Sequence, residues 1–125
     1  MNVACVDTSC LVAIAFGERG AAALARRLEA FDVLAASDLL EAELRCAFAR
    51  EGIGGEPEML GAMSWIVPDR PLSAEIGRVL RAGSVRGADC WHLAAALYLA
   101  EDPSAITFLT LDDRQAAVAK SLGFR

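Results

Sequence analysis

The chain has 125 residues, of which 55% are hydrophobic and 23% charged, and its mean hydropathy is +0.38. These values predict one folded domain over residues 1–125 and exclude a disordered or low-complexity protein. Lys and Arg number 12 against 17 Asp and Glu, a formal net charge of -5, so any nucleic-acid role must be local rather than spread over a basic surface.

The expected elements alternate between strands and helices along the chain. The first strand covers residues 2–6, and Asp7 ends it before a helix over 10–16. A second helix is expected over 18–30, a strand over 31–36 and a helix over 37–50. Pro57 suits the first turn of a helix over 57–65, which is followed by a short strand over 66–68 and a helix over 72–82. A nearly all-apolar helix over 87–101, a strand over 106–111 and a helix over 112–122, ended by Gly123, complete the chain.

The strands are short and apolar on both faces, and helices separate them. This pattern predicts an α/β fold with a buried, mainly parallel central sheet. Ligands of such sheets bind beyond the carboxyl ends of the strands, so functional side chains are expected just after strands or at the starts of helices. A lysine-dependent P-loop or Schiff-base enzyme is disfavoured, because Lys120 is the single lysine.

Four acidic residues are expected near that edge of the sheet. Asp7 follows the first strand, Asp112 follows the last, and Asp89 lies in the first turn of the most apolar helix. On the helix over 37–50, a turn of about 100° per residue places Glu43 about 40° from Leu39, which points it towards the core side.

Each acid also has a purely structural interpretation. Taken singly, each of the three aspartates near a helix start could cap that helix or complement its N-terminus; these are Asp7, Asp89 and Asp112. An ion pair with Arg50 would neutralise Glu43. Glu41 is assigned a structural role, because it can pair with Arg45 at i,i+4 and form a capping box with Asp38.

Capping does not require acids from four separate segments to converge on one sheet edge, with no Lys or Arg adjacent to three of them. Clustered carboxylates repel one another unless a hard divalent ion takes the place of protein cations. Mg²⁺ or Mn²⁺ suits oxygen ligands best. Two such ions would change the bookkeeping charge from -5 to about -1 and allow a polyanion to approach.

The compartment is expected to be the cytoplasm. The longest apolar stretches, 10–17 and 93–100, are shorter than the ~18 residues of a membrane span. The N-terminus has no basic region, and Asp7 interrupts it where a signal peptide would be apolar. The four cysteines lack C-x-x-C spacing and lie in apolar neighbourhoods, which predicts buried thiols rather than zinc ligands or disulfides at Cys5, Cys10, Cys46 and Cys90.

Four motifs in chain order resemble the PIN-domain family, in particular the VapC-type toxins of prokaryotic toxin and antitoxin pairs. They are Val6-Asp7-Thr8-Ser9, Ser37 with Glu43-Leu44-Arg45, Arg86-Gly87-Ala88-Asp89-Cys90-Trp91-His92-Leu93-Ala94, and Thr110-Leu111-Asp112 before Arg114. The resemblance spans almost the whole chain and implies a PIN-like three-layer α/β/α fold. It departs from the commonest pattern at Cys90-Trp91 and at the doubled Asp112-Asp113, which leaves the substrate choice and the number of bound ions open.

By resemblance, the acidic metal site consists of Asp7, Glu43, Asp89 and Asp112. Hydroxyls around the metal or substrate would come from Thr8 or Ser9 and from Thr110, and Asp113 is a nearby acid with a weaker claim. His92, one turn after Asp89, either orients that carboxylate or is a hydrogen-bonded core histidine. Solvated or helix-pairing roles are expected for Arg19, Arg45, Arg86 and Arg114, and the alternative is contact with phosphate.

The resemblance implies an Mg²⁺- or Mn²⁺-dependent endoribonuclease that acts as a toxin, forms a homodimer and is blocked by a cognate antitoxin protein. One alternative is a catalytically silent PIN-like module that binds RNA or protein. Another is an aspartate-phosphorylated domain, but no Asp stands two residues after Asp7 and no Lys follows a late strand. A partner face or ordinary core is expected for the apolar side chains Leu24, Leu28, Phe48 and Trp65.

Overall fold

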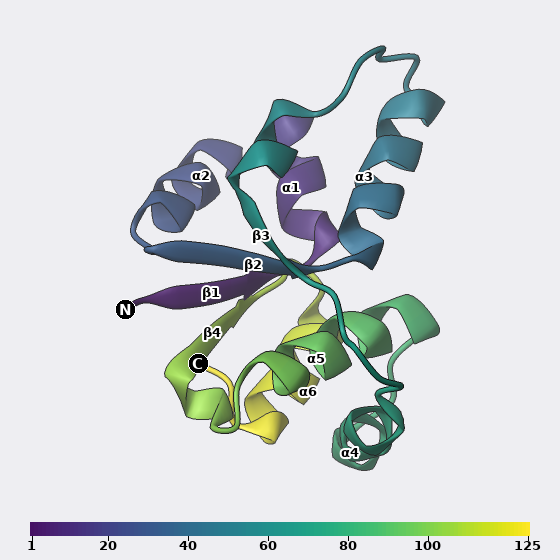
Figure 1. The fold of residues 1–125 in the computed structure, drawn as a ribbon. Coiled ribbons are helices and arrows are strands. Elements are labelled where there is room, and N and C mark those ends of the chain that lie inside the picture. The colour runs from purple at the N-terminus through teal and green to yellow at the C-terminus, as the bar shows by residue number, and fades with distance from the viewer.

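The central sheet has four parallel strands in the order β3-β2-β1-β4 (Figure 1). The computed structural model describes residues 1–125. Val3 of β1 lies opposite Val33 of β2 and Ile106 of β4, so the strands are in register at their amino ends. The strand bounds are β1 Val3–Val6, β2 Val33–Ser37, β3 Met63–Ile66 and β4 Ile106–Leu109.

Six α-helices cover the two faces of the sheet, three on each side (Figure 1). One layer contains α1 (Thr8–Ala15), α2 (Ala21–Glu29) and α3 (Leu39–Arg50). The other contains α4 (Ser73–Ala82), α5 (Gly87–Leu99) and α6 (Asp113–Leu122), and two short 3₁₀ helices cover Glu58–Ala62 and Pro103–Ala105. The expected three-layer α/β/α fold with a parallel sheet is confirmed. None of the helices has the length and apolarity to cross a bilayer.

Each face of the sheet has its own hydrophobic core, because successive side chains of a strand point to opposite faces. In β1, Ala4 packs with α1, α2 and α3, whereas Cys5 packs with α4, α5 and α6. Both side chains are almost completely buried. This double burial explains why the strands are apolar throughout rather than alternating.

The segment over 57–66 differs from the expectation. The helix predicted over 57–65 is limited to the 3₁₀ helix over residues 58–62, and β3 begins at Met63 rather than at Ile66. Trp65 therefore lies in a strand, where it is opposite Ala36 of β2. Pairing with β2 supplies backbone hydrogen bonds that a local helix signal cannot outweigh, which is a tertiary effect on secondary structure.

The cysteine prediction is correct for three of the four residues and wrong for Cys46, which is exposed on α3. The buried side chains of α3 are Leu40, Leu44 and Ala47, so position 46 lies outside the buried stripe of the helix. No cysteine forms a disulfide. Burial raises the pKa of the Cys5 thiol to about 12.

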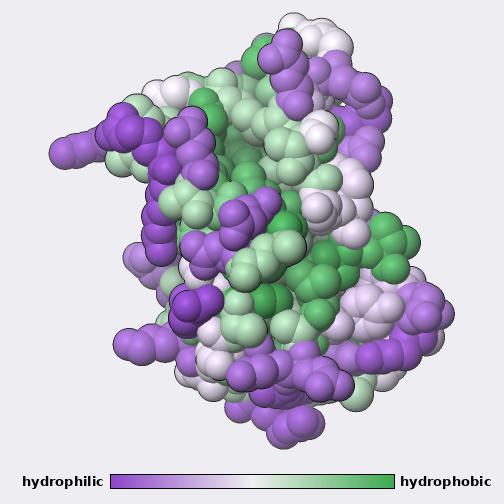
Figure 2. All heavy atoms as spheres, turned by 60° about the vertical axis from the view of Figure 1, so that its left-hand side comes forward, coloured by the Kyte–Doolittle hydropathy of each residue, from purple (hydrophilic) through white to green (hydrophobic).

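Of the four apolar residues expected in a partner face or in ordinary core, three belong to the core. Leu28 is buried, and Leu24 and Phe48 pack against the same cluster, whereas Trp65 is 36% exposed on β3. Apolar side chains also gather on the face shown in Figure 2. Near the amino ends of the strands, a hollow of about 370 Å³ is lined almost entirely by hydrophobic residues, including Trp65 and Leu99.

Candidate active site

Several of the predicted site residues follow the carboxyl ends of two neighbouring strands, β1 and β4. Asp7 comes directly after β1, and its N–H donates to the carbonyl of Leu109 at 3.1 Å, which extends the pairing with β4. Thr110 and Asp112 follow β4. The neighbouring parallel strands β1 and β4 thus deliver Asp7 and the Thr110–Asp112 turn to the same end of the sheet, as the parallel topology predicts.

Asp7 is a buried carboxylate held by two hydroxyl groups. Asp7 is only 3% exposed. Ser9 Oγ donates to Asp7 Oδ1 at 2.6 Å, and Thr110 Oγ1 lies 2.7 Å from Asp7 Oδ2. No Lys or Arg forms an ion pair with it. A buried carboxylate needs such donors, because burying an unpartnered charge is costly. Although Asp7 is the N-cap residue of α1, its side chain makes no capping hydrogen bond, so capping does not explain it.

Thr110 connects Asp7 to the start of α6. Its hydroxyl lies 2.7 Å from Asp7 Oδ2 and 2.8 Å from Gln115 Oε1, and it accepts from the Asp112 N–H at 3.0 Å. Because a hydroxyl carries one proton, Thr110 donates to Asp7 or to Gln115 at any one time. The position of Asp7 is therefore coupled to that of the first turn of α6.

Gln115 is a site residue that the sequence analysis missed. It is fully buried, its N–H donates to Asp112 Oδ1 at 2.8 Å, and its side-chain amide donates to the Asp89 carbonyl at 3.3 Å. The buried positions of α6 are 115, 118, 119 and 122, so Gln115 occupies a helical stripe that is otherwise apolar. A glutamine in such a stripe is a recognisable signal, since buried polar groups require partners.

Glu43 projects from α3 towards Thr8 and His92. Thr8 Oγ1 donates to Glu43 Oε1 at 2.7 Å, and His92 Nε2 lies 2.6 Å from the same oxygen. The Glu43 side chain is 34% exposed, so it faces the site from a half-buried position. The predicted alternative of an ion pair with Arg50 is wrong, because the partner of Glu43 is a histidine.

His92 is buried and bridges α3 and β2. Its Nδ1 lies 2.7 Å from Ser37 Oγ, and its Nε2 contacts Glu43. With the proton on Nε2, both contacts are satisfied, because the Ser37 hydroxyl then donates to Nδ1. The interpretation of His92 as a hydrogen-bonded core histidine is confirmed, and the carboxylate that it orients is Glu43 rather than Asp89. The contact between His92 and Glu43 could not be predicted from the residues near His92 in the sequence, because it depends on the packing of α5 against α3.

Asp89 lies in the first turn of α5 and is half-buried. Desolvation raises the pKa of its carboxyl, and the negative charges of Asp112, Asp7 and Glu43 raise it further, while His92 lowers it. The four predicted ligands are thus close enough to influence one titration. The Asp89 side chain accepts no hydrogen bond within the protein, which leaves its oxygens uncommitted.

Asp112 is exposed and caps α6. Its Oδ1 accepts the Gln115 N–H, so the capping interpretation holds for this residue. The capping box predicted for Asp38 and Glu41 is wrong: the Asp38 side chain accepts from Trp91 Nε1 at 3.0 Å instead. Glu41 does pair with Arg45 at 2.9 Å, as expected.

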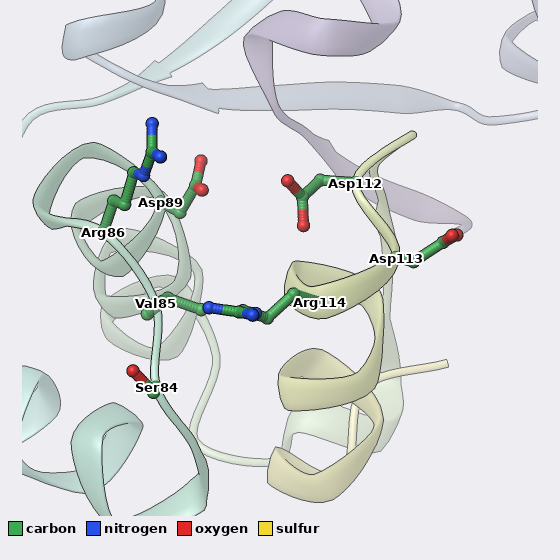
Figure 3. A pocket seen from close by; sticks show the side chains of 7 residues that line it. All are labelled: Ser84, Val85, Arg86, Asp89, Asp112, Asp113 and Arg114. Atoms are coloured by element: carbon green, nitrogen blue, oxygen red, sulfur yellow. The ribbon is translucent and has the colours of Figure 1, made fainter.

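Asp89 and Asp112 face each other across a hollow of about 610 Å³ (Figure 3). Asp89 projects from the start of α5 and Asp112 from the turn before α6, whereas Asp113 borders the hollow with its carboxylate directed away from Asp89. Two cationic side chains, Arg86 and Arg114, and the hydroxyl side chain of Ser84 complete the polar part of the lining.

The donor set fits a hard divalent cation. The four acids offer only oxygen atoms, and no Lys or Arg forms an ion pair with any of them. After desolvation, the other three acids also raise the pKa of Asp89, and a bound cation would offset that repulsion. No three His, Cys, Asp or Glu side chains are arranged closely enough to enclose a metal ion in the present side-chain positions.

The acids stand beyond the carboxyl ends of the strands, which is where parallel α/β domains bind their ligands. The model of the PIN domain family matches residues 4–121, which is nearly the whole chain, and the protein belongs to that family. PIN domains are generally nucleases. No curated protein matches the chain.

Proposed function

We propose that this single PIN domain, residues 1–125, is a metal-dependent endoribonuclease that hydrolyses RNA phosphodiester bonds. The observation that supports the proposal is a group of four acids from four segments at one sheet edge, none of them in an ion pair with Lys or Arg. Membership of the PIN domain family supports nuclease chemistry independently.

In this proposal, Mg²⁺ or Mn²⁺ is held by Asp7, Glu43, Asp89 and Asp112. The bound ion supplies Lewis acidity, which activates water for attack on the phosphodiester and stabilises the leaving oxygen. The protein's own contribution is orientation. Ser9 and Thr110 fix the two oxygens of Asp7, while Thr8 and His92 hold Glu43 Oε1 and leave Oε2 without a hydrogen bond.

The biological role that we propose is that of a VapC-type toxin in the cytoplasm, which forms a homodimer and is inhibited by a cognate antitoxin. The apolar hollow that includes Trp65 and Leu99 supports a protein partner, because exposed apolar patches of this kind are typical of interaction surfaces. Copurification with the product of the neighbouring gene tests this role. Failure to retain any such protein would contradict the toxin assignment and leave the nuclease proposal standing.

One observation favours the alternative of a catalytically silent binding module. Both oxygens of Asp7 and one oxygen of Glu43 are already engaged by hydroxyl groups and His92, as expected of carboxylates with a structural role. Asp89 distinguishes the two functions, because its side chain makes no hydrogen bond within the protein and has no evident structural purpose.

The test is cleavage of total prokaryotic RNA by the purified chain in Mg²⁺ or Mn²⁺ and in chelator, with the new RNA ends mapped. We expect discrete metal-dependent cuts that Asp89→Asn reduces by about 1,000-fold or more, since it removes one ligand carboxylate. Glu29→Gln, which removes an exposed carboxylate at the end of α2, is the matched control and should cleave normally. RNA binding without cleavage under any metal would favour the silent module.

A further inference from the structure

Two arginines border the same hollow as the proposed metal ligands. Arg86 immediately precedes α5, and Arg114 lies in the first turn of α6. Together with Asp89 and Asp112 they line the hollow of about 610 Å³ (Figure 3). The Arg114 side chain reaches across the hollow towards Val85, whereas Arg86 projects beside Asp89.

Neither arginine serves as a counter-ion for a carboxylate of the protein. The arginines that do form ion pairs are Arg45, with Glu41 and Glu56, and Arg70, with Glu75. The charges that shift the pKa of Asp89 come from other acids and from His92, not from Arg86 or Arg114. Two guanidinium groups thus stand next to an acidic site without neutralising it.

The fold fixes the spacing of these two arginines. The segment that leads from α4 to Arg86 begins with Gly83, where a Cβ atom would come within 2.7 Å of Val118 Cγ2 on α6. This close approach packs the backbone before Arg86 against the same helix that carries Arg114. The two cationic side chains therefore come from neighbouring, packed elements rather than from independent loops.

We propose that Arg86 and Arg114 bind the phosphate oxygens of the RNA strand beside the bond that is cut. The inference rests on the proposed nuclease function. It adds that the bound RNA lies on the side of the site formed by α5 and α6. Arginine suits this task, because its planar guanidinium donates two parallel hydrogen bonds to a phosphate. With a net charge of -5, the chain has to concentrate its phosphate contacts in a local site of this kind.

Binding separates this role from that of a solvated surface arginine. We would measure the affinity of a fluorescein-labelled single-stranded RNA by anisotropy over a KCl series at constant Mg²⁺, using Asp89→Asn to prevent cleavage. In that background, Arg86→Gln and Arg114→Gln should each weaken binding about tenfold. Each should also reduce the slope of log K against log salt by about 0.7, since one phosphate contact is lost.

Two further variants make the comparison specific. Arg26→Gln removes an exposed arginine of α2 and should change neither quantity by more than a general charge effect. Compared with the glutamine variants, Arg86→Lys and Arg114→Lys should restore the salt slope but only part of the affinity. Lysine keeps the positive charge but cannot donate two parallel hydrogen bonds to a phosphate.

The inference is overturned if the two glutamine variants match Arg26→Gln, or if the Asp89→Asn chain binds no RNA. Its failure is distinct from failure of the nuclease proposal. If the unchanged chain cuts RNA, and both glutamine substitutions leave binding normal in the Asp89→Asn background and cleavage normal in the chain that keeps Asp89, only the arginine assignment is wrong. If the unchanged chain never cuts RNA but the glutamine variants lose binding as described, the phosphate site holds and the nuclease proposal fails.

Discussion

The candidate site has two unlike halves. Around Asp7 and Glu43, the carboxylates are buried or half-buried, and hydroxyl groups and a histidine hold them. Around Asp89 and Asp112, the side chains border an open hollow with two unpaired arginines. The first half is preorganised by the protein, whereas the second leaves its charges to be satisfied from outside. A substrate and a metal ion would meet at the open half, with the closed half as a fixed support.

The largest expected effect on stability is in the closed half. His92→Ala should lower the free energy of unfolding by about 3 kcal/mol, because it leaves a cavity and removes the partner of the buried Ser37 hydroxyl and of Glu43. His92→Gln, which can still place an amide donor near Glu43, should lose less. Urea unfolding measures both. Arg114→Gln in the open half is the contrast and should change stability by less than about 0.5 kcal/mol.

The second effect tests the connection between the halves. Gln115→Leu suits the apolar stripe of α6 but removes the donor to the Asp89 carbonyl and the contact with Thr110. We expect a loss of about 2 kcal/mol in chemical unfolding, since buried polar groups lose their partner. Ser121→Ala, on the exposed side of the same helix, is the matched control. Equal stability of the two variants would mean that the halves are not coupled through this glutamine.

The sequence predicted the fold well and the site only in outline. Apolar strands alternating with helices sufficed for the parallel sheet, and the sheet then placed Asp7 and Asp112 at one edge. The contact of His92 with Glu43 was beyond the sequence, because it depends on how α5 packs against α3. Local sequence alone favours a helix over part of 63–66, because the strand partner of this segment, β2, lies about thirty residues away in the chain. Local patterns predict elements, whereas side-chain partners across elements require the packed structure.

A smaller effect distinguishes capping from metal binding at Asp112. Asp112→Ala should lower stability by about 1 kcal/mol, because the Gln115 N–H loses its acceptor. Asp112→Ser keeps an acceptor at the helix start, so its thermal unfolding should be close to that of the unchanged chain. Both variants should lose metal-dependent cleavage. A serine variant that cleaves RNA normally would reduce Asp112 to a helix cap.

The smallest expected effect concerns Asp89 and depends on pH. Because the pKa of Asp89 is raised in the folded chain, the folded state binds a proton at this carboxyl more readily than the unfolded state does. The stability contributed by this group is therefore present below the ordinary pKa of an aspartate and is lost as the pH rises through the raised value. Asp89→Asn removes this loss, so the variant should melt slightly higher than the unchanged chain at neutral pH and the difference should shrink in acid. A variant inactive on RNA yet more stable at neutral pH is expected of a charge kept for function, since a structural carboxylate would cost stability when removed. Thermal melts from pH 4 to 8 measure the difference, and a lower melting temperature at neutral pH would show that Asp89 stabilises the closed half instead.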